Sequence, residues 1–181
     1  MDMTTPDRDI AAVLEAVRRG FAARDAGAIT AFYTADAEIF DLAPPLSHAI
    51  DPAGLAAWLA GWGGPVEQTP HGMTTTISGD AAFCHGLVRV DTETKEGEAR
   101  GWWMRATICL ARRHGQWRIV HEHSSVPFYM DGSFRAAIDL NPERARPQAP
   151  GEPSGSPAGR NQMSPSRGLS SGARRFASAG T

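Results

Sequence analysis

Apolar residues near the start of the chain recur every three or four positions, which predicts a helix with one buried face. The residues of this face are Ile10, Val13, Leu14, Val17 and Phe21. Thr5, Pro6 and Asp7 precede it with an N-cap hydroxyl, a proline at the first helical position and an acid near the positive end of the helix dipole. We expect this helix to end near residues 25–27.

Two further helices and one strand follow by the same criteria. A short helix should carry Ile29, Phe32 and Tyr33, and residues 37–41 (AEIFD) alternate as a strand does. Asp51-Pro52 then opens a third helix that ends at residues 63–65 (GGP). The apolar side of this third helix comprises Leu55, Trp58, Leu59 and Trp62.

The rest of the patterned chain is strand material. The four segments are residues 72–78, 81–93, 99–111 and 116–129, with turn signals at Gly79-Asp80 and His114-Gly115. Three N-terminal helices followed by an antiparallel meander predict an α+β fold, in which a strongly curved, mostly antiparallel sheet forms a cone-shaped barrel around the helices.

Composition divides the chain into a domain at residues 1–144 and a Pro/Gly/Ser/Arg-rich tail at 145–181. The domain carries 13 basic and 19 acidic side chains, and the tail carries five arginines and one glutamate. The tail has too few large apolar residues to offset the entropy of ordering, so we expect it to be disordered, although binding to an acidic partner is an alternative. The acidic domain argues against a nucleic-acid partner.

The sequence also bears on compartment and cofactors. The first thirty residues do not resemble a secretory signal, and no apolar run has the length of a membrane span, so we expect a cytoplasmic protein without a membrane partner. Cys84 and Cys109 lie in strand-like runs without zinc-ligand spacing. Phosphate loops, dinucleotide fingerprints and nucleophile-elbow serines are absent from the sequence, so we expect no cofactor and no metal.

The opening of the domain resembles a known family. Residues 17–41 (VRRGFAARDAGAITAFYTADAEIFD) form a helix, an Asp-Ala-Gly break, a short aromatic helix and a D-A-x-apolar-x-D strand. This pattern resembles ketosteroid isomerase and the SnoaL-like polyketide cyclases of the nuclear transport factor 2-like superfamily. The later G-x-W-R-I-V-H-E-H run is similar too, and the likeness covers roughly residues 8–130.

The resemblance implies a site for acid/base chemistry. Asp41 falls on the position of the isomerase's catalytic base, where apolar neighbours would partly desolvate it; a capping or turn role before Pro44 is the alternative. The isomerase's oxyanion-binding tyrosine falls on Val17 and its protonated aspartate on Thr107. Both oxyanion donors are therefore missing, which argues against steroid isomerisation by that mechanism.

In the isomerase register, alternate residues of three strands would point into the pocket. These residues are His85, Leu87, Arg89, Trp103, Arg105, Thr107, Val120, Glu122 and Ser124. Asp41 would then abstract a proton, Arg105 and His85 would stabilise an enolate, and Glu122, at the position of the cyclases' acid/base aspartate, would return a proton. A structural ion pair between Glu122 and Arg105 is the alternative.

Further residues are expected in the walls of the pocket and around its mouth. Tyr33, Trp58, Trp103, Thr107, Ser124 and His123 are the expected substrate-binding residues, and His48 and His71 should lie near the mouth. His121 and His123 should face away from the pocket in this register, whereas a one-residue slip would turn them inward.

Two functions remain open. One is a cofactor-independent isomerase, lyase or cyclase acting on a small hydrophobic or polyketide-like molecule, and the other is a non-catalytic ligand-binding or assembly module on the same fold. For either function we expect a homodimer through the outer face of the meander, which we expect to carry Ile108, Leu110, Trp117 and Ile119.

Overall fold

The computed structural model describes residues 5–142, which belong to one compact unit, Met1–Arg146. The expected disordered tail at 145–181 lies outside the described residues. The helices are α1 (Thr5–Ala23), α2 (Ala26–Thr30) and α3 (Pro52–Ala60). The strands are β1 (Tyr33–Phe40), β2 (His48–Ala49), β3 (Glu67–Ser78), β4 (Ala81–Glu93), β5 (Ala99–Arg113) and β6 (Gln116–Ser125).

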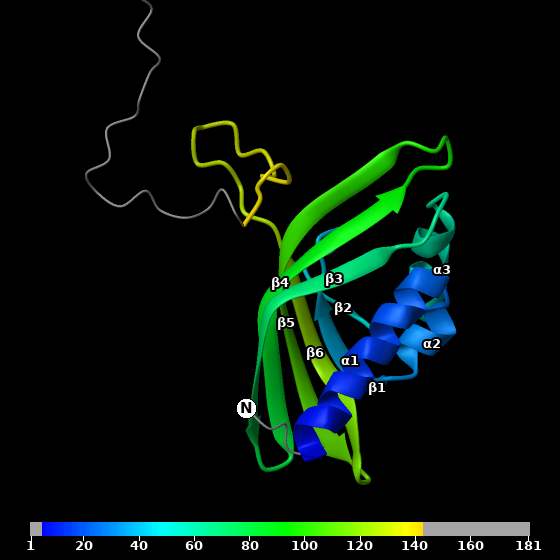
Figure 1. Ribbon diagram of the computed structural model, residues 1–181, viewed down its shortest axis with the longest axis vertical. Helices are drawn as coiled ribbons and strands as arrows, with labels where there is room; N and C mark the ends of the chain where they lie inside the picture. The colour runs from blue at the N-terminus through cyan, green and yellow to red at the C-terminus, as the bar shows by residue number, and fades with distance from the viewer. Residues whose placement is uncertain (1–4, 143–181) are drawn as a thin grey trace, which may run out of the picture. The chain divides into compact units, whose positions relative to one another are not determined.

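All six strands form one curved sheet, with the helices on its inner face (Figure 1). The strand order is β2-β1-β6-β5-β4-β3, so β2 and β3 are the edges. The pairs β3–β4, β4–β5 and β5–β6 are antiparallel hairpins, whereas β1 lies parallel to β6. The predicted α+β fold of three helices on a curved sheet is confirmed, and the sheet is mixed and open.

Local capping explains where two helices begin. The Asp25 carboxylate accepts a hydrogen bond from the Ala28 backbone N–H (2.9 Å) at the start of α2. At α3, Asp51 Oδ1 accepts from the N–H groups of Ala53 (3.1 Å) and Gly54 (3.0 Å), as an N-cap aspartate does. A Cβ at position 54 would collide with the Asp51 carboxylate and would push it out of its capping position, so glycine favours this cap.

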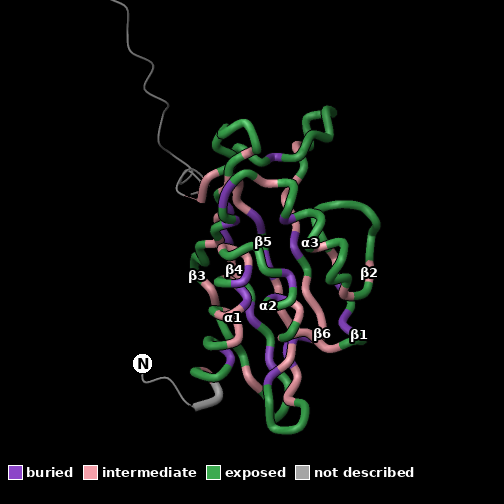
Figure 2. The backbone as a smooth tube through the Cα atoms, turned by 90° about the vertical axis from the view of Figure 1, so that its right-hand side faces the viewer, coloured by how far each residue is buried: buried purple, intermediate pink, exposed green. Residues whose placement is uncertain are grey.

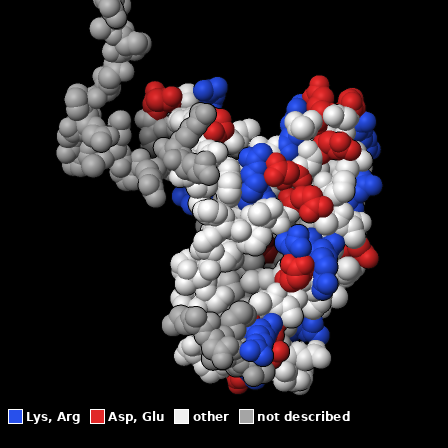
Figure 3. Space-filling view, viewed as in Figure 1, with Lys and Arg blue, Asp and Glu red and all other residues white. Residues whose placement is uncertain are grey.

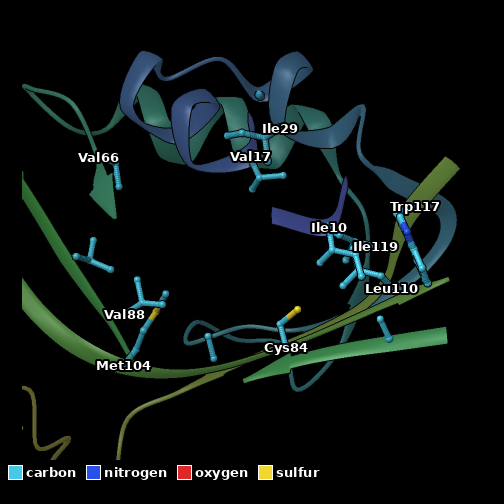
Figure 4. Packing of buried hydrophobic residues seen from close by; sticks show 14 of the residues in the cluster. Ile10, Val17, Ile29, Val66, Cys84, Val88, Met104, Leu110, Trp117 and Ile119 are labelled. Carbon is cyan, nitrogen blue, oxygen red and sulfur yellow. The ribbon is translucent and has the colours of Figure 1, made fainter. Parts of the chain in front are cut away.

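The core lies between the helices and the inner face of the sheet (Figure 4). Ile10 and Ile29 contribute from the helices, and Leu110 and Ile119 from the strands; each is about 1% exposed or less. Along β4, Cys84, Val88 and Val90 are buried while the residues between them are more exposed, and this alternation is visible in Figure 2. The even-numbered residues of β4 therefore face the helices.

A β-bulge at Val120 sets the relation between β5 and β6. Near the hairpin turn, Leu110 pairs with Ile119, but the next pair is Cys109 with His121, so Val120 is skipped. A bulge of one residue reverses the alternation of side chains along the strand that contains it. Consequently Ile119 faces the helices before the bulge, and Glu122 and Ser124 face the same side after it.

The structure corrects two expectations about the elements. Tyr33 begins β1 instead of lying in the second helix, and a short strand, β2, forms at residues 48–49. The four residues expected on the outer face of the meander, Ile108, Leu110, Trp117 and Ile119, belong to the core beneath the helices. Among residues 5–142, no helix has the length and apolar character that a membrane span requires.

Candidate active site

A cavity of about 510 Å³ lies between the helices and the inner face of the sheet. Its floor comes from β1, β5 and β6, and its other walls come from α1, α3 and the residue 41–50 segment, which includes a cis peptide bond between Pro44 and Pro45. The lining is mainly apolar with a few polar side chains, as is usual for small-molecule sites. This is the best candidate for a functional site.

Two titratable side chains are hydrogen-bonded to each other in this cavity. The Tyr33 hydroxyl at the start of β1 donates a short hydrogen bond to Glu122 Oε2 on β6. The two residues are 89 positions apart, and the parallel pairing of β1 with β6 brings their strands together. Ser124, which is only 6% exposed, lies two residues further along β6 and lines the same cavity.

The cavity shifts the pKa of both members of this pair. Burial raises the pKa of Glu122 above its ordinary value and outweighs the opposing hydrogen bond from Tyr33; the nearby Asp41 carboxylate raises this pKa further. Burial, and then the adjacent Glu122 charge, raise the pKa of Tyr33 well above that of a free tyrosine. A carboxyl with a raised pKa is suited to donate a proton near neutrality.

Asp41 follows the last residue of β1 and lines the same cavity. It is exposed instead of desolvated, and its Oδ1 accepts a hydrogen bond from the Leu42 backbone N–H (2.6 Å). Asp41 therefore lies at the pocket, and its hydrogen bond to Leu42 is one that a turn aspartate makes.

Three tryptophans form a continuous aromatic wall. The rings of Trp58 and Trp62 meet edge to face with centroids 5.8 Å apart, and Trp62 lies 6.2 Å from Trp102. All three line the cavity, and Trp58 is 42% exposed. Trp58 was the one expected from the sequence. Trp62 and Trp102 were missed because tryptophans at helix or strand spacing are usually core residues.

The structure does not bring His85, Arg105 or Thr107 to the cavity. Paired residues of adjacent strands share a face, and His85 pairs with Thr107 while Leu87 pairs with Arg105. These residues line an open depression on the outer face of the sheet, together with His71. The prediction that they point inward is wrong, and the alternative ion pair between Glu122 and Arg105 is wrong for the same reason.

Trp103, Arg89 and His123 also lie on the outer face. Trp103 packs against His71 (5.7 Å between ring centroids), and Phe40 packs against His121 (4.8 Å) and His123 (5.8 Å). The prediction that His121 and His123 face away from the pocket is confirmed, but the expected binding roles of Trp103 and His123 in the pocket are not supported by these positions. His48 does line the cavity.

Within residues 5–142, no three His, Cys, Asp or Glu side chains are arranged to hold a metal ion. The polar and aromatic groups of the cavity are carboxylates, hydroxyls, the imidazole of His48, the amide of Gln68 and aromatic rings. These can position an organic molecule and move protons.

The fold and the cavity together define a nuclear transport factor 2-like protein. A solved NTF2-like protein of unknown function from Pseudomonas putida KT2440 superposes with a TM-score of 0.69 at 30% identity, covering 78% of this chain and 100% of its own. Residues 10–129 match the family model described as a SnoaL-like domain. The chain belongs to this SnoaL-like family.

Other solved structures share the fold at lower identity. A chain from Xanthomonas campestris, described as a calcium/calmodulin dependent protein kinase II association domain, has a TM-score of 0.60 at 19% identity and covers 68% of this chain and 88% of its own. The association domain of C. elegans CaMKII has a TM-score of 0.53 at 21% identity, with 66% and 95% covered. No curated protein matches the chain.

Proposed function

We propose that this protein catalyses a cofactor-independent proton transfer, in an isomerisation, elimination or cyclisation of a small hydrophobic or polyketide-like molecule. The main observation behind this proposal is that Glu122, hydrogen-bonded to Tyr33, lines the same cavity as Asp41. Two carboxyl groups in different environments can divide the roles of acid and base. The family assignment supports isomerase-like or ligand-binding proteins as the class.

The roles follow from the environments. The exposed Asp41 abstracts a proton from carbon, which leaves the electron pair on the substrate as an enolate or its equivalent. Glu122, with its raised pKa, supplies a proton to the substrate at a second atom. Tyr33 holds the Glu122 carboxyl in position through its hydrogen bond. His85 and Arg105 have no part in this scheme because they lie on the other face of the sheet.

The test is hydrogen exchange into carbon acids. Small cyclic enones and 1,3-diketones are incubated in D2O with the protein, and the loss of the α-proton signal is followed by NMR. Exchange above the buffer rate is expected, and Asp41→Asn and Glu122→Gln should each lower it by about 10²–10⁴-fold, the usual worth of a positioned acid or base. His85→Gln is the control and should leave the rate unchanged.

A non-catalytic ligand-binding module is the second candidate. It is favoured by the exposure of Asp41 and by its hydrogen bond to Leu42, which a turn aspartate would also make. In that case these compounds bind without exchange above the buffer rate. Equal exchange by the wild type and by both carboxyl variants would also reject the catalytic roles.

We further propose a homodimer that buries the outer face of the sheet, in the cytoplasm as expected from the sequence. The helices cover only the inner face, and the outer face carries Phe83, which is 42% exposed, with Leu87 and Trp103 further along the same face. The surface over the lower part of β3 to β5 is largely uncharged, whereas acids and bases are mixed over α1 and over the upper ends of these strands (Figure 3). Exposed apolar side chains on a sheet face that no helix covers are typical of protein interfaces.

A further inference from the structure

The acidic side chains that line the cavity outnumber the basic ones. They are Asp41, Asp51 and Glu122; Glu122 carries its proton in the proposed scheme, so Asp41 and Asp51 supply the negative charge. No arginine or lysine of the described residues lines the cavity; Arg24 comes near, but its guanidinium donates to the backbone oxygen of Trp62 (2.7 Å). Among the described residues, the imidazole of His48 is the basic group of the lining, and no arginine or lysine joins it, so an anionic ligand would enter against net repulsion from the carboxylates.

The aromatic wall adds a second preference. Trp58, Trp62 and Trp102 line the cavity as neighbours, with successive centroids 5.8 Å and 6.2 Å apart. The face of an indole ring carries partial negative charge and attracts a cation placed over it, most strongly where water is excluded. Trp58 is half exposed and lies where a ligand could reach it from solvent.

These two features combine with the volume. A cavity of about 510 Å³ falls within the range of small-molecule sites, and its apolar walls favour a ligand with a hydrophobic body. Acidic side chains and indole rings in one cavity favour a positively charged ligand. A purely apolar lining would not distinguish a charged ligand of one sign from the other.

We propose that the ligand of this cavity is an organic cation, an amine with an aromatic or aliphatic body, whose ammonium group lies against the tryptophan wall and near Asp41. This proposal names the substrate class of the proposed function. It rests on that function only because both use the same cavity. The amine is recognised and takes no part in the bond changes, so proton transfer at carbon proceeds as described above.

The experiment compares three compounds with the same phenyl body and different charge. Phenethylamine is a cation near neutral pH, 2-phenylethanol is neutral and phenylacetate is an anion. Dissociation constants are measured by ligand-observed NMR titration of the full chain. Phenethylamine should bind about tenfold more tightly than 2-phenylethanol, as a cation–π contact with a nearby carboxylate predicts, and phenylacetate should bind most weakly.

Two pairs of variants locate the preference in the cavity. Asp41→Asn should weaken phenethylamine binding severalfold and leave 2-phenylethanol unchanged, whereas Glu38→Gln, which removes a carboxylate on the outer side of β1, should change neither. Trp58→Leu should weaken phenethylamine more than 2-phenylethanol. The matched Trp103→Leu, on the outer face, should have no effect on either compound.

The outcomes separate this proposal from the proposed function. If 2-phenylethanol or phenylacetate binds as tightly as phenethylamine, or if none of the three binds, the cavity does not select cations and the inference is wrong. Neither result bears on proton transfer, which is judged by the D2O exchange of the carboxyl variants. Conversely, a clear preference for phenethylamine without any exchange supports the cation class and rejects catalysis.

Discussion

Glu122 and Tyr33 illustrate how the surroundings of single residues set their chemistry. Neither residue has a distinctive local motif, yet their hydrogen bond places a half-buried carboxyl beside a phenol in the cavity. Burial raises the pKa of Glu122, so the folded protein binds this proton more tightly than the unfolded chain does. The consequence is a pH dependence of stability that a single substitution can isolate.

Glu122→Gln should flatten this pH dependence. The contribution of Glu122 to the free energy of unfolding is fully present below the ordinary glutamate pKa and falls as the pH rises through the raised pKa, because the folded state then has to bury a charge. Urea denaturation from about pH 4 to about pH 8, a range that spans the ordinary glutamate pKa, should show this fall in the wild type. This fall in the free energy of unfolding should be reduced in Glu122→Gln and retained in the exposed control Glu38→Gln. Identical pH profiles for all three proteins would contradict the prediction.

At the scale of elements, helix α3 depends on its N-terminal aspartate. Asp51 Oδ1 accepts two backbone hydrogen bonds there, and removing an N-cap acceptor leaves those N–H groups without their partner. Asp51→Ala should therefore lower the free energy of unfolding by about 0.5–2 kcal/mol in urea denaturation. Asp51→Asn keeps an acceptor oxygen and should recover most of the loss; equal losses in the two variants would show that the cap is not what stabilises α3.

The strand β6 shows why the pocket face was only partly predicted. An unbulged hairpin continuing the pair Leu110–Ile119 would place Thr107 opposite Glu122, as the register adopted from the isomerase implies. The bulge at Val120 instead pairs Ile108 with Glu122 and Thr107 with His123. Glu122 and Ser124 were placed correctly, while His85 and Arg105 were placed on the wrong face.

At the scale of the whole molecule, the two faces of the sheet differ in what covers them. The outer face carries Phe83, Leu87 and Trp103 in place of the residues expected there, so the homodimer prediction now depends on this set. Light scattering at micromolar concentration should give twice the 19.4 kDa chain mass. Leu87→Asp should give the single-chain mass, because a charge would then be buried in the interface. Ala12→Asp, which adds the same charge on the exposed side of α1, should remain dimeric; a wild type of single-chain mass would reject the interface.

The composition of residues 145–181 leads to a prediction about stability. This segment offers almost no large apolar residues for a core. Truncation after Glu143 should leave the melting temperature within about 2 °C of the full chain, since 1 kcal/mol shifts it by about 2–8 °C in domains of this size. Differential scanning calorimetry of both lengths measures it, and a larger drop would mean that the segment docks on the domain.

Local signals in the sequence predicted most of the elements, with β2 and the assignment of Tyr33 as the exceptions, and they carried the family resemblance. Helical spacing from Ile10 to Phe21, the Asp51-Pro52 start and the turn residues are local signals, because capping, proline geometry and hydrophobic periodicity act within a few positions. Asp41, Glu122 and Ser124 were placed in the pocket from these signals and from the resemblance.

The other features of the site depend on contacts between distant parts of the chain, which are found in the tertiary structure alone. The parallel pairing that brings Tyr33 to Glu122 joins residues 89 positions apart, and the Val120 bulge decides which side chains of β6 share a face with those of β5. Apolar residues occupy both faces of β4 and β5, so alternation alone does not identify the inner face, and the packing of the helices on one side of the sheet settles it.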